Sequence, residues 1–506
     1  MDKHLYYRRQ FLLANNEINE LSFWQHIKVS GKNLYAHPDL EITTKELNSI
    51  QIVLLGYIFD PFHPDKKNAD ILSEIIFKIN KFTDLIAHLK PYPGRYAIIY
   101  KDEENFNILH DALGLREIYF CIQPNKIICG SQPNLIDKYS LPKLGITNDQ
   151  NILNFYAHDM KSIRSGRMWI GDETYFTNIK KLISNHYLDI NSLTAKRYWP
   201  NKRLESMNFD QAVKLSCAYL QGTLKAVTSR FDVMMAVTSG IDSRSLLASS
   251  KEVKEKIYYY INKHPHLNDK SPDIRIPRDI FKKLNIPFHI HEYSATVDDE
   301  FKKIFLDNTF MSSELNLPAI YNVYYKNHAN KINLLGVGEI GREFYGKAPV
   351  DLDGYYLARS LKYKYSKYAT EQCEKWLTEA KKVSEVYNVD IMKMLLWEVL
   401  LGNWGVVGNS ESDIAIEEFD PYNSHYIYEI MLSLDPVKEN LFEGMFTGMW
   451  PELLGFPFNP AETISDWIKH WLGRFGFANG FKRTLYRLDR WKFRKMMEAK
   501  KVQIVR

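Results

Sequence analysis

The sequence predicts a chain that joins an α+β domain to an α/β domain built on a parallel sheet. Before Pro200, short β-branched and aromatic runs bounded by turn residues surround a helical segment, which is typical of a layered α+β domain. After Pro200, short apolar runs alternate with helical patterns, which is typical of an open parallel sheet with helices on both faces. A length of 506 residues agrees with two or three domains.

The predicted elements of the first domain follow from local patterns. Strands are predicted where apolar or aromatic runs end at Pro, Gly, Asn or Asp, and a helix where apolar residues recur at helical spacing after a capping Asn. The predicted strands are 50–59, 95–102 and 126–132, and the predicted helix is 68–82. We expect this domain to end within 181–200.

The second domain is predicted to alternate strand and helix. Its predicted strands are 232–237, 256–262, 287–293 and 331–338; its predicted helices are 208–231, a helix beginning near Ser243, and 273–284. From Ser366 onward the pattern favours helices, and we expect the short strands to stop there.

Composition excludes several classes of function. With 45% apolar and 25% charged residues the chain is typical of a globular protein, and a net charge of +5 is too dilute to indicate a nucleic-acid partner. The N-terminus has neither a signal peptide nor a membrane span, so no membrane partner is expected. The four cysteines have no metal or redox spacing, which suits a reducing cytoplasm; they are Cys121, Cys129, Cys217 and Cys373.

The loop after the first parallel strand is the main candidate site. It lies where a doubly wound sheet binds ligands, and its small residues let backbone N–H groups approach an anion at the start of a helix. The candidate nucleotide-binding residues are Thr238, Ser239, Gly240, Asp242, Ser243 and Arg244. A carboxylate beside a phosphate suggests Mg²⁺ coordination by Asp242. The alternative is an ordinary strand-to-helix turn capped by Ser.

The motif VTSGIDSR at 237–244 resembles SGGxDS, the pyrophosphate-binding loop of ATP pyrophosphatases. GRYAIIYKDEENFNILHDALGLREIYF at 94–120 and IEEFDPYNSHYIYEIMLSL at 416–434 resemble segments of asparagine synthetases, and the similarity spans roughly 54–434. The resemblance implies a glutaminase-like αββα sandwich over 1–200 and an ATP-binding domain over 201–506. It also implies ATP and Mg²⁺ as cofactors.

The sequence departs from that family where glutamine would be hydrolysed. Glutamine-hydrolysing members carry an N-terminal Cys whose own amine is the base, whereas residue 2 here is Asp. The segment LLGYIFD at 54–60 also replaces an Asn-Gly oxyanion segment. We therefore expect a degenerate glutaminase-like domain, as in the β-lactam synthetases and lasso-peptide cyclases that this branch resembles.

A Gly-rich turn after the fourth strand supplies a second candidate. The family has G-x-G-x-D-E there; LLGVGEIGREFYG at 334–346 keeps the glycines but lacks the Asp. Glu339 is the candidate catalytic and Mg²⁺ residue, and Arg342 could neutralise phosphate charge. The alternative is a solvated turn.

Two further catalytic candidates rest on the resemblance. Glu417 matches the glutamate that supports proton transfer from the attacking amine, with a structural salt-bridge carboxylate as the alternative reading. Lys482 is the candidate for the lysine that stabilises pyrophosphate, with Arg474 and Lys469 as alternatives.

These observations predict a biosynthetic, AMP-forming carbon–nitrogen ligase. It would adenylate a small-molecule or peptide carboxylate, release pyrophosphate, and couple the adenylate to an amine without hydrolysing glutamine. The alternatives are an ammonia-dependent asparagine synthetase and an inactive nucleotide-binding or scaffold protein. The sequence leaves the substrates and the oligomeric state open, a homodimer included.

Overall fold

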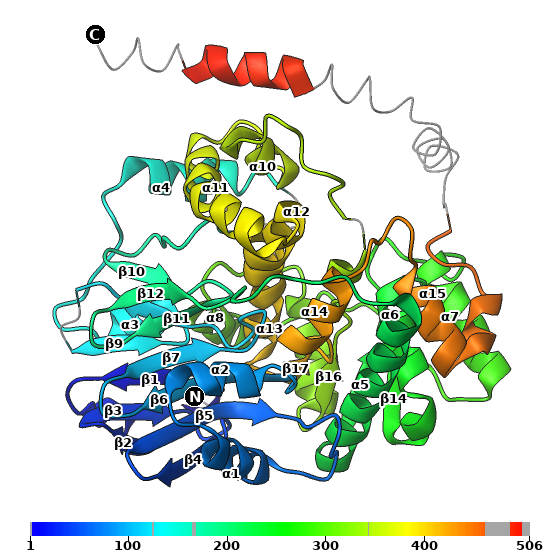
Figure 1. Ribbon diagram of the computed structural model, residues 1–506, viewed down its shortest axis with the longest axis horizontal. Coiled ribbons are helices and arrows are strands. Elements are labelled where there is room, and N and C mark those ends of the chain that lie inside the picture. The colour runs from blue at the N-terminus through cyan, green and yellow to red at the C-terminus, as the bar shows by residue number, and fades with distance from the viewer. Residues whose placement is uncertain (1–2, 124–125, 164–167, 343, 461–485, 498–506) are drawn as a thin grey trace.

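The described residues form three β-sheets surrounded by helices, and the fold belongs to the mixed α/β and α+β class that the sequence predicts. A computed structural model describes residues 3–123, 126–163, 168–342, 344–460 and 486–497. Strands β1–β12 precede Pro200 and form two sheets, and strands β13–β17 form the third. Figure 1 shows the two N-terminal sheets on one side of the molecule and the third sheet beside them.

The two N-terminal sheets are antiparallel and have six strands each. The first, in the order β10-β8-β9-β1-β3-β2, comprises β1 (Phe11–Ala14), β2 (Gln25–Val29), β3 (Lys32–Ala36), β8 (Tyr119–Cys121), β9 (Ile127–Gly130) and β10 (Ile179–Lys181). The second, in the order β12-β11-β7-β6-β5-β4, comprises β4 (Ile42–Leu47), β5 (Ile50–Ile58), β6 (Gly94–Lys101), β7 (Phe106–His110), β11 (His186–Asp189) and β12 (Thr194–Arg197).

These sheets pack face to face, because alternate side chains of each point inward. Phe11 and Leu13 of β1 meet Val53 and Leu55 of β5 in one buried core. Helices cover both outer faces: α1 (Asn68–Lys78) and α2 (Phe82–Leu89) lie on the second sheet, and α3 (Pro133–Tyr139) lies on the first. The result is a four-layer α-β-β-α arrangement.

The third sheet is parallel throughout and has five strands in the order β15-β14-β13-β16-β17. Its strands are β13 (Val233–Ala236), β14 (Ile257–Asn262), β15 (His289–His291), β16 (Ile332–Leu334) and β17 (Glu417–Phe419). Val233 and Met235 pack on one face, whereas Met234 packs on the other. Both faces are therefore buried, as a parallel sheet requires.

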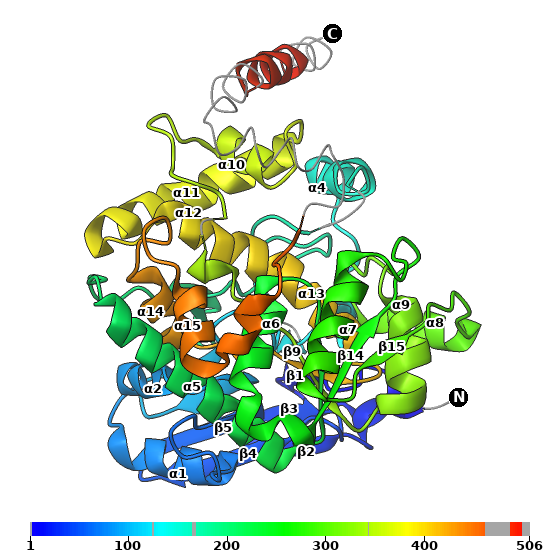
Figure 2. The same cartoon turned by 90° about the vertical axis from the view of Figure 1, so that its right-hand side faces the viewer.

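Helices cover the two faces of this sheet. Those around its larger core are α5 (Phe209–Arg230), α6 (Ile241–Ser249), α7 (Pro272–Leu284), α14 (His425–Leu432) and α15 (Leu441–Met449). The opposite face is covered by α8 (Asp299–Asn308), α9 (Leu317–Ala319) and the π-helical turns η5 (Ile320–His328). Figure 2 shows α5, α6 and α15 as one group, with α8 and α9 beyond β15.

A helical layer joins the two halves. It comprises α10 (Gly354–Ser360), α11 (Lys367–Tyr387), α12 (Ile391–Met394), η7 (Leu395–Gly405) and α13 (Val406–Ser412). Leu377 of α11 and Leu395 of η7 share a core with Leu12 of β1 and Leu135 of α3. The C-terminal half of the chain thus completes the hydrophobic core of the N-terminal half. Other short helices are η1 (Lys3–Leu5), η2 (Asn19–Leu21), α4 (Gln150–Asn154), η3 (Phe155–Asp159), η4 (Lys251–Lys256), η6 (Glu339–Gly341) and η8 (Pro451–Gly455), and the described residues 486–497 are helical as well.

Two expectations are corrected. The predicted helix 68–82 ends at Lys78 as α1, because the chain is extended at Ile79 after α1 and at Lys81 before α2, and α2 (Phe82–Leu89) was not predicted beyond its first residue. The prediction that strands stop after Ser366 is wrong, since β17 adds a fifth strand beside β16. Three residues are too few to show a strand pattern in the sequence.

Within the described ranges, the helical run Ile391–Ser412 is long and apolar enough to cross a membrane, with a mean hydropathy of 1.2. However, 61% of its apolar window is buried inside the structure. Trp397, at the middle of this run, is fully buried and donates from Nε1 to the carbonyl of Ala112 at 2.8 Å. In this structure the run is a core helix.

Candidate functional site

The candidate loop lies at the carboxyl end of β13, between Ala236 and the first turn of α6. Gly240 is the N-cap residue of α6, with φ −69° and ψ 155°. The helix begins two residues earlier than predicted, so Asp242 as well as Ser243 lies in its first turn. Since the carboxyl edge of a parallel sheet is where such folds bind ligands, the loop has the predicted location.

The backbone N–H groups of this loop are engaged by acceptors of the protein itself. The N–H of Thr238 donates to Ser243 Oγ at 3.1 Å, and the N–H of Gly240 donates to Thr238 Oγ1 at 3.1 Å. Ser239 donates to Oδ1 of Asp273, on α7, from its N–H at 2.9 Å and from its Oγ at 2.6 Å. A carboxylate oxygen thus occupies donors that an incoming phosphate would need.

Asp242 forms an ion pair with Arg342. Arg342 Nη2 lies 2.6 Å from Asp242 Oδ2. The other oxygen, Asp242 Oδ1, is buried and has no hydrogen-bond partner among the described residues. Burial raises the pKa of Asp242, and the charge of Arg342 opposes this rise. The loop and the Gly-rich turn, which are 100 residues apart in sequence, are thereby brought together.

Glu339 begins the short turn η6 and faces the same region. Its Oε2 is buried and is likewise unpaired within the part of the chain that the structure describes. Burial, followed by the charge of Asp242, raises the pKa of Glu339 to about 7. Arg342 Nη2 lies 4.0 Å from Glu339 Oε1. The side chain is only 20% exposed, so Glu339 is not the solvated residue of the alternative reading.

Asp420, directly after β17, is a third acidic residue here, and the sequence analysis did not identify it. Its Oδ1 accepts from the N–H of Tyr422 at 3.1 Å and of Val337 at 3.4 Å. Burial raises the pKa of Asp420 well above its ordinary value, and the charges of Glu339 and Asp242 add to the effect. The only signal in the sequence is that Asp420 follows an apolar residue and precedes a proline.

Two glycines allow these segments to approach one another. A Cβ on Gly336 would lie 3.0 Å from the carbonyl oxygen of Asp242, and a Cβ on Gly338 would lie 3.0 Å from Asp242 Oδ1. Such spacing is closer than side chains normally tolerate. The predicted Gly-rich turn therefore has a packing function against the first turn of α6.

The residues predicted to hold Mg²⁺ have suitable chemistry for that ion. Asp242 and Glu339 each present a buried carboxylate oxygen that accepts from no donor among the described residues, and Mg²⁺ prefers oxygen ligands. No group of three or more Asp, Glu, His or Cys side chains in the described ranges is arranged as a metal cage. This agrees with nucleotide-linked Mg²⁺, which takes one or two carboxylates and completes its shell with phosphates and water.

Arg244 lies on the buried side of α6. Its Nη1 donates to the carbonyl of Phe456 at 3.2 Å, and its guanidinium lies 3.4 Å from the ring centroid of Phe458. The segment continues to Asn459, whose N–H donates to the carbonyl of Ser239 at 3.2 Å. The aromatic, proline-rich segment 450–460 thus covers both Arg244 and the loop. Burial lowers the pKa of Arg244 to about 10.

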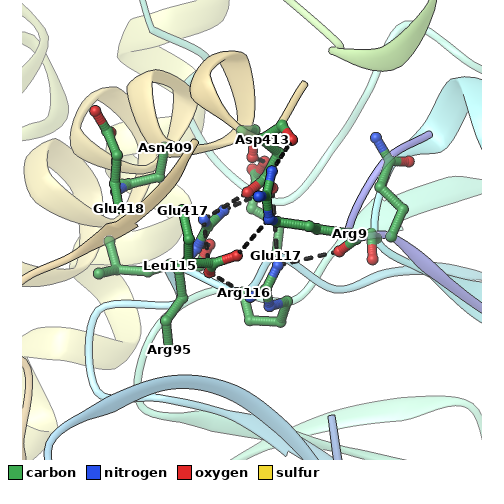
Figure 3. A network of polar contacts seen from close by, with 12 residues as sticks. Arg9, Arg95, Leu115, Arg116, Glu117, Asn409, Asp413, Glu417 and Glu418 are labelled. Carbon is green, nitrogen blue, oxygen red and sulfur yellow. Dashed lines mark hydrogen bonds and ion pairs between the residues drawn. The ribbon is translucent and has the colours of Figure 1, made fainter. Parts of the chain in front are cut away.

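Glu417 lies at the start of β17, in an ion cluster with three arginines from the N-terminal half (Figure 3). Glu417 Oε1 accepts from Arg116 Nη2 at 2.7 Å and from Arg95 Nη1 at 3.1 Å, and Oε2 lies 3.1 Å from Arg9 Nε. Asp413 is the second carboxylate, 2.6 Å from Arg95. In the structure Glu417 thus forms ion pairs between the C-terminal and N-terminal halves of the chain.

The electrostatics of this cluster make Glu417 a weak base. Burial opposes ionisation, but Arg116, Arg95 and Arg9 outweigh it and hold the pKa of Glu417 below its ordinary value. A general base near neutral pH needs a higher pKa. Glu417 also lies at the amino-terminal end of β17. Asp420 lies beyond the carboxyl end of that strand, beside the Gly-rich turn that contacts the loop. Lys482, Arg474 and Lys469 lie outside the described residues.

None of the four cysteines has the environment of a nucleophile. Burial raises the pKa of Cys121 to about 12 and of Cys217 to about 11, and it raises the pKa values of Cys129 and Cys373 further. Cysteine reactivity requires a lowered pKa and access to solvent. Asp2, which stands at the expected nucleophile position, lies outside the described residues.

Comparison with known proteins gives little further information. No family model matches the sequence, and no curated protein matches it. Among solved structures, a glutamine phosphoribosylpyrophosphate amidotransferase from B. subtilis, complexed with ADP and GMP, is similar at 12% identity and a TM-score of 0.23. The match covers 55% of this chain and 65% of that chain, which is less than two thirds of its length.

A second structure, described as the allosteric regulatory enzyme of purine biosynthesis, is similar at 12% identity and a TM-score of 0.23. That match covers 63% of this chain and 84% of the other. Similarities this weak support no conclusion about activity, so the candidate function rests on the site itself.

Proposed function

We propose that the protein is an AMP-forming carbon–nitrogen ligase of the asparagine synthetase type that does not hydrolyse glutamine. The observation that carries the proposal is the meeting of Asp242, Glu339 and Arg342 beside the Thr238–Ser243 loop, at the carboxyl edge of the parallel sheet. In this reading the loop binds the phosphates of ATP. Asp242 and Glu339 hold Mg²⁺, which would neutralise charge on the departing pyrophosphate.

Arg342 has a suitable position to attract an anionic substrate. Besides pairing with Asp242, it lines a small cavity of about 80 Å³, whose other charged lining residues are Lys347, Lys393, Asp390 and Asp435. Lys393 Nζ donates to the carbonyl of Ile340 at 2.6 Å, which fixes one cationic group at the wall. Phe344 and Tyr345 supply apolar surface. At about 80 Å³ the cavity would hold a small carboxylate, or the carboxylate end of a larger substrate, which would be adenylated beside the loop.

The buried cysteines support amide formation without glutamine hydrolysis. An amine that belongs to the substrate, or a separate amine, would attack the adenylate carbonyl, forming the amide and releasing AMP. Glu417 is not proposed as the base for this step, because its carboxylate is held ionised by three arginines.

The test is exchange of labelled pyrophosphate into ATP, together with AMP release, in the presence of pooled carboxylic acids. We expect substrate-dependent exchange in the wild type and a loss of about 10²–10³ in Asp242→Ala. Asp279→Asn on the exposed side of α7 is the matched control, and its exchange should equal that of the wild type. If the protein bound Mg²⁺-ATP but no carboxylic acid supported exchange of pyrophosphate into ATP, the proposed ligase activity would be contradicted.

A second candidate is an inactive nucleotide-binding or scaffold protein. Two observations favour it: the N–H groups of the loop are already engaged by Ser243, Thr238 and Asp273, and Glu417 serves an ion cluster. The same experiment separates the two, since this candidate predicts nucleotide binding with neither exchange nor AMP formation.

A further inference from the structure

We propose that Asp420 positions the divalent cation of this site, by accepting a hydrogen bond at Oδ2 from a water molecule bound to that cation. The inference rests on the proposed function, because it assumes a cation held by Asp242 and Glu339. It adds a residue to the site that neither the loop motif nor the Gly-rich turn predicts.

The first observation is an unused acceptor in a fully buried carboxyl group. Asp420 is 0% exposed, and its Oδ1 accepts from the N–H groups of Tyr422 and Val337. Its Oδ2 is buried and, over the ranges that the structure describes, has no donor. A buried carboxylate oxygen without a donor is costly, and a bound water or ion is the usual remedy.

The second observation is that Asp420 is tied to the predicted cation ligands from two sides. Val337, which donates to Asp420, lies between the two glycines that pack against Asp242. On the other side, the hydroxyl of Tyr422 lies 2.5 Å from Ser245 Oγ, and Ser245 Oγ donates to the carbonyl of Asp242 at 2.6 Å. The position of Asp420 relative to Asp242 is therefore fixed by hydrogen bonds.

The third observation concerns charge. The charges of Glu339 and Asp242, both acidic, act on Asp420, whereas Arg342 pairs with Asp242. Burial and mutual repulsion disfavour the ionised forms of these three carboxyl groups, and a bound cation would offset both effects. The phosphates of ATP would therefore need the cation between themselves and Asp420.

A water-mediated contact agrees better with the geometry than direct coordination. The described Asp, Glu, His and Cys side chains contain no group of three arranged to hold a metal ion together. Mg²⁺ usually keeps several of its waters in nucleotide sites. Residues that orient the ligands or waters of a metal typically change its affinity by about 10–100-fold when removed.

The experiment measures how much Mg²⁺ strengthens nucleotide binding. The probe is an ATP analogue with a methylene bridge between the α- and β-phosphates, titrated calorimetrically with EDTA and again with millimolar Mg²⁺. The ratio of the two dissociation constants reports the contribution of the cation. The comparison includes the wild type, Asp420→Asn and Asp420→Ala. The thermal unfolding temperature of each protein is measured as well.

Asp420→Asn keeps an oxygen for the N–H groups of Val337 and Tyr422, but it replaces the accepting Oδ2 with a donor. We expect the dissociation constant in EDTA divided by that in Mg²⁺ to fall about tenfold or more, while the affinity for the analogue in EDTA is unchanged. Glu418→Gln is the matched control. Glu418 is a buried carboxyl on β17, two residues before Asp420, but its oxygens accept from Asn333 at 3.1 Å and Asn409 at 3.3 Å. Its ratio should equal that of the wild type.

If Asp420→Asn had the same ratio of dissociation constants in EDTA and in Mg²⁺ as the wild type, the inference would be overturned. If Asp420→Ala alone then lost unfolding temperature, the role of Asp420 would be that of a structural hydrogen-bond acceptor. Failure of the wild type to bind the analogue under either condition would instead overturn the proposed function, so the two failures are distinguishable.

Discussion

The carboxylate of Glu417 stabilises the folded chain only while it is ionised. Arg9, Arg95 and Arg116 surround it, and removing one member of a buried ion cluster leaves the others uncompensated. We expect Glu417→Gln to lower the free energy of unfolding by about 3–5 kcal/mol, measured by urea titration. Glu371→Gln, in an exposed pair with Lys367 at 3.7 Å, should change it by less than about 1 kcal/mol.

The same residue gives the stability a pH dependence of known sign. The pKa of Glu417 is lower in the folded chain than in the unfolded chain. Its contribution is therefore fully present above the unfolded-state pKa, about 4.3, and is lost as the pH falls through the folded-state value. We expect the stability difference between wild type and Glu417→Gln to be constant from pH 8 to 6 and to shrink below about pH 4. A difference that grew on acidification would contradict this assignment.

At the scale of single elements, α7 controls the loop through Asp273. The Oδ1 of Asp273 accepts two hydrogen bonds from Ser239 and places a negative charge beside the proposed phosphate site. We expect Asp273→Asn to bind inorganic pyrophosphate about five- to tenfold more tightly, a gain of about 1–1.4 kcal/mol measured by calorimetry. Asp279→Asn on the same helix should leave the affinity unchanged. Weaker binding in Asp273→Asn would mean that Asp273 shapes the loop for phosphate.

The Gly-rich turn is a second element whose packing can be tested. A Cβ on Gly336 would press on the backbone of Asp242 and Ser243, at 3.0 Å from the carbonyl oxygen and 3.3 Å from the nitrogen. Backbone cannot move aside as a side-chain tip can, so Gly336→Ala should cost about 1–3 kcal/mol in stability and weaken binding of Mg²⁺-ATP. Gly408→Ala, where nothing lies within 4 Å of the added carbon, is the control.

At the scale of the whole molecule, the two halves of the chain share buried contacts. Asn423 Nδ2 donates to the carbonyl of Gly94 at 2.7 Å, and Lys90 Nζ lies 2.6 Å from Glu429. Helices α11 and η7 complete the core of the first sheet. We expect one cooperative calorimetric transition. Fragments 1–200 and 201–506 should aggregate when expressed apart and copurify when expressed together; two resolved transitions would contradict this.

Much of the architecture could be predicted from local patterns. The alternation of apolar runs and helical segments after Pro200 predicted β13, β14 and β16 within about two residues at their starts, because buried parallel strands are short apolar runs. The end of α1 at Lys78 was missed, since the helical pattern continues across Ile79 to Lys81, and α2 was not predicted beyond its first residue, Phe82. The strand β17 was missed because two of its three residues are glutamates.

The sequence by itself determined the class of the fold and the place of the loop, and it identified Asp242 and Glu339 as candidate residues, because these depend on residue type and on short-range order. Only the tertiary structure decided which acidic residues meet. It placed Asp420 beside the loop and Glu417 among arginines from the other half of the chain, although only two residues separate them. The physical reason is that Glu417 is the first residue of β17, whereas Asp420 directly follows its last residue, so that the two lie at opposite ends of one short strand.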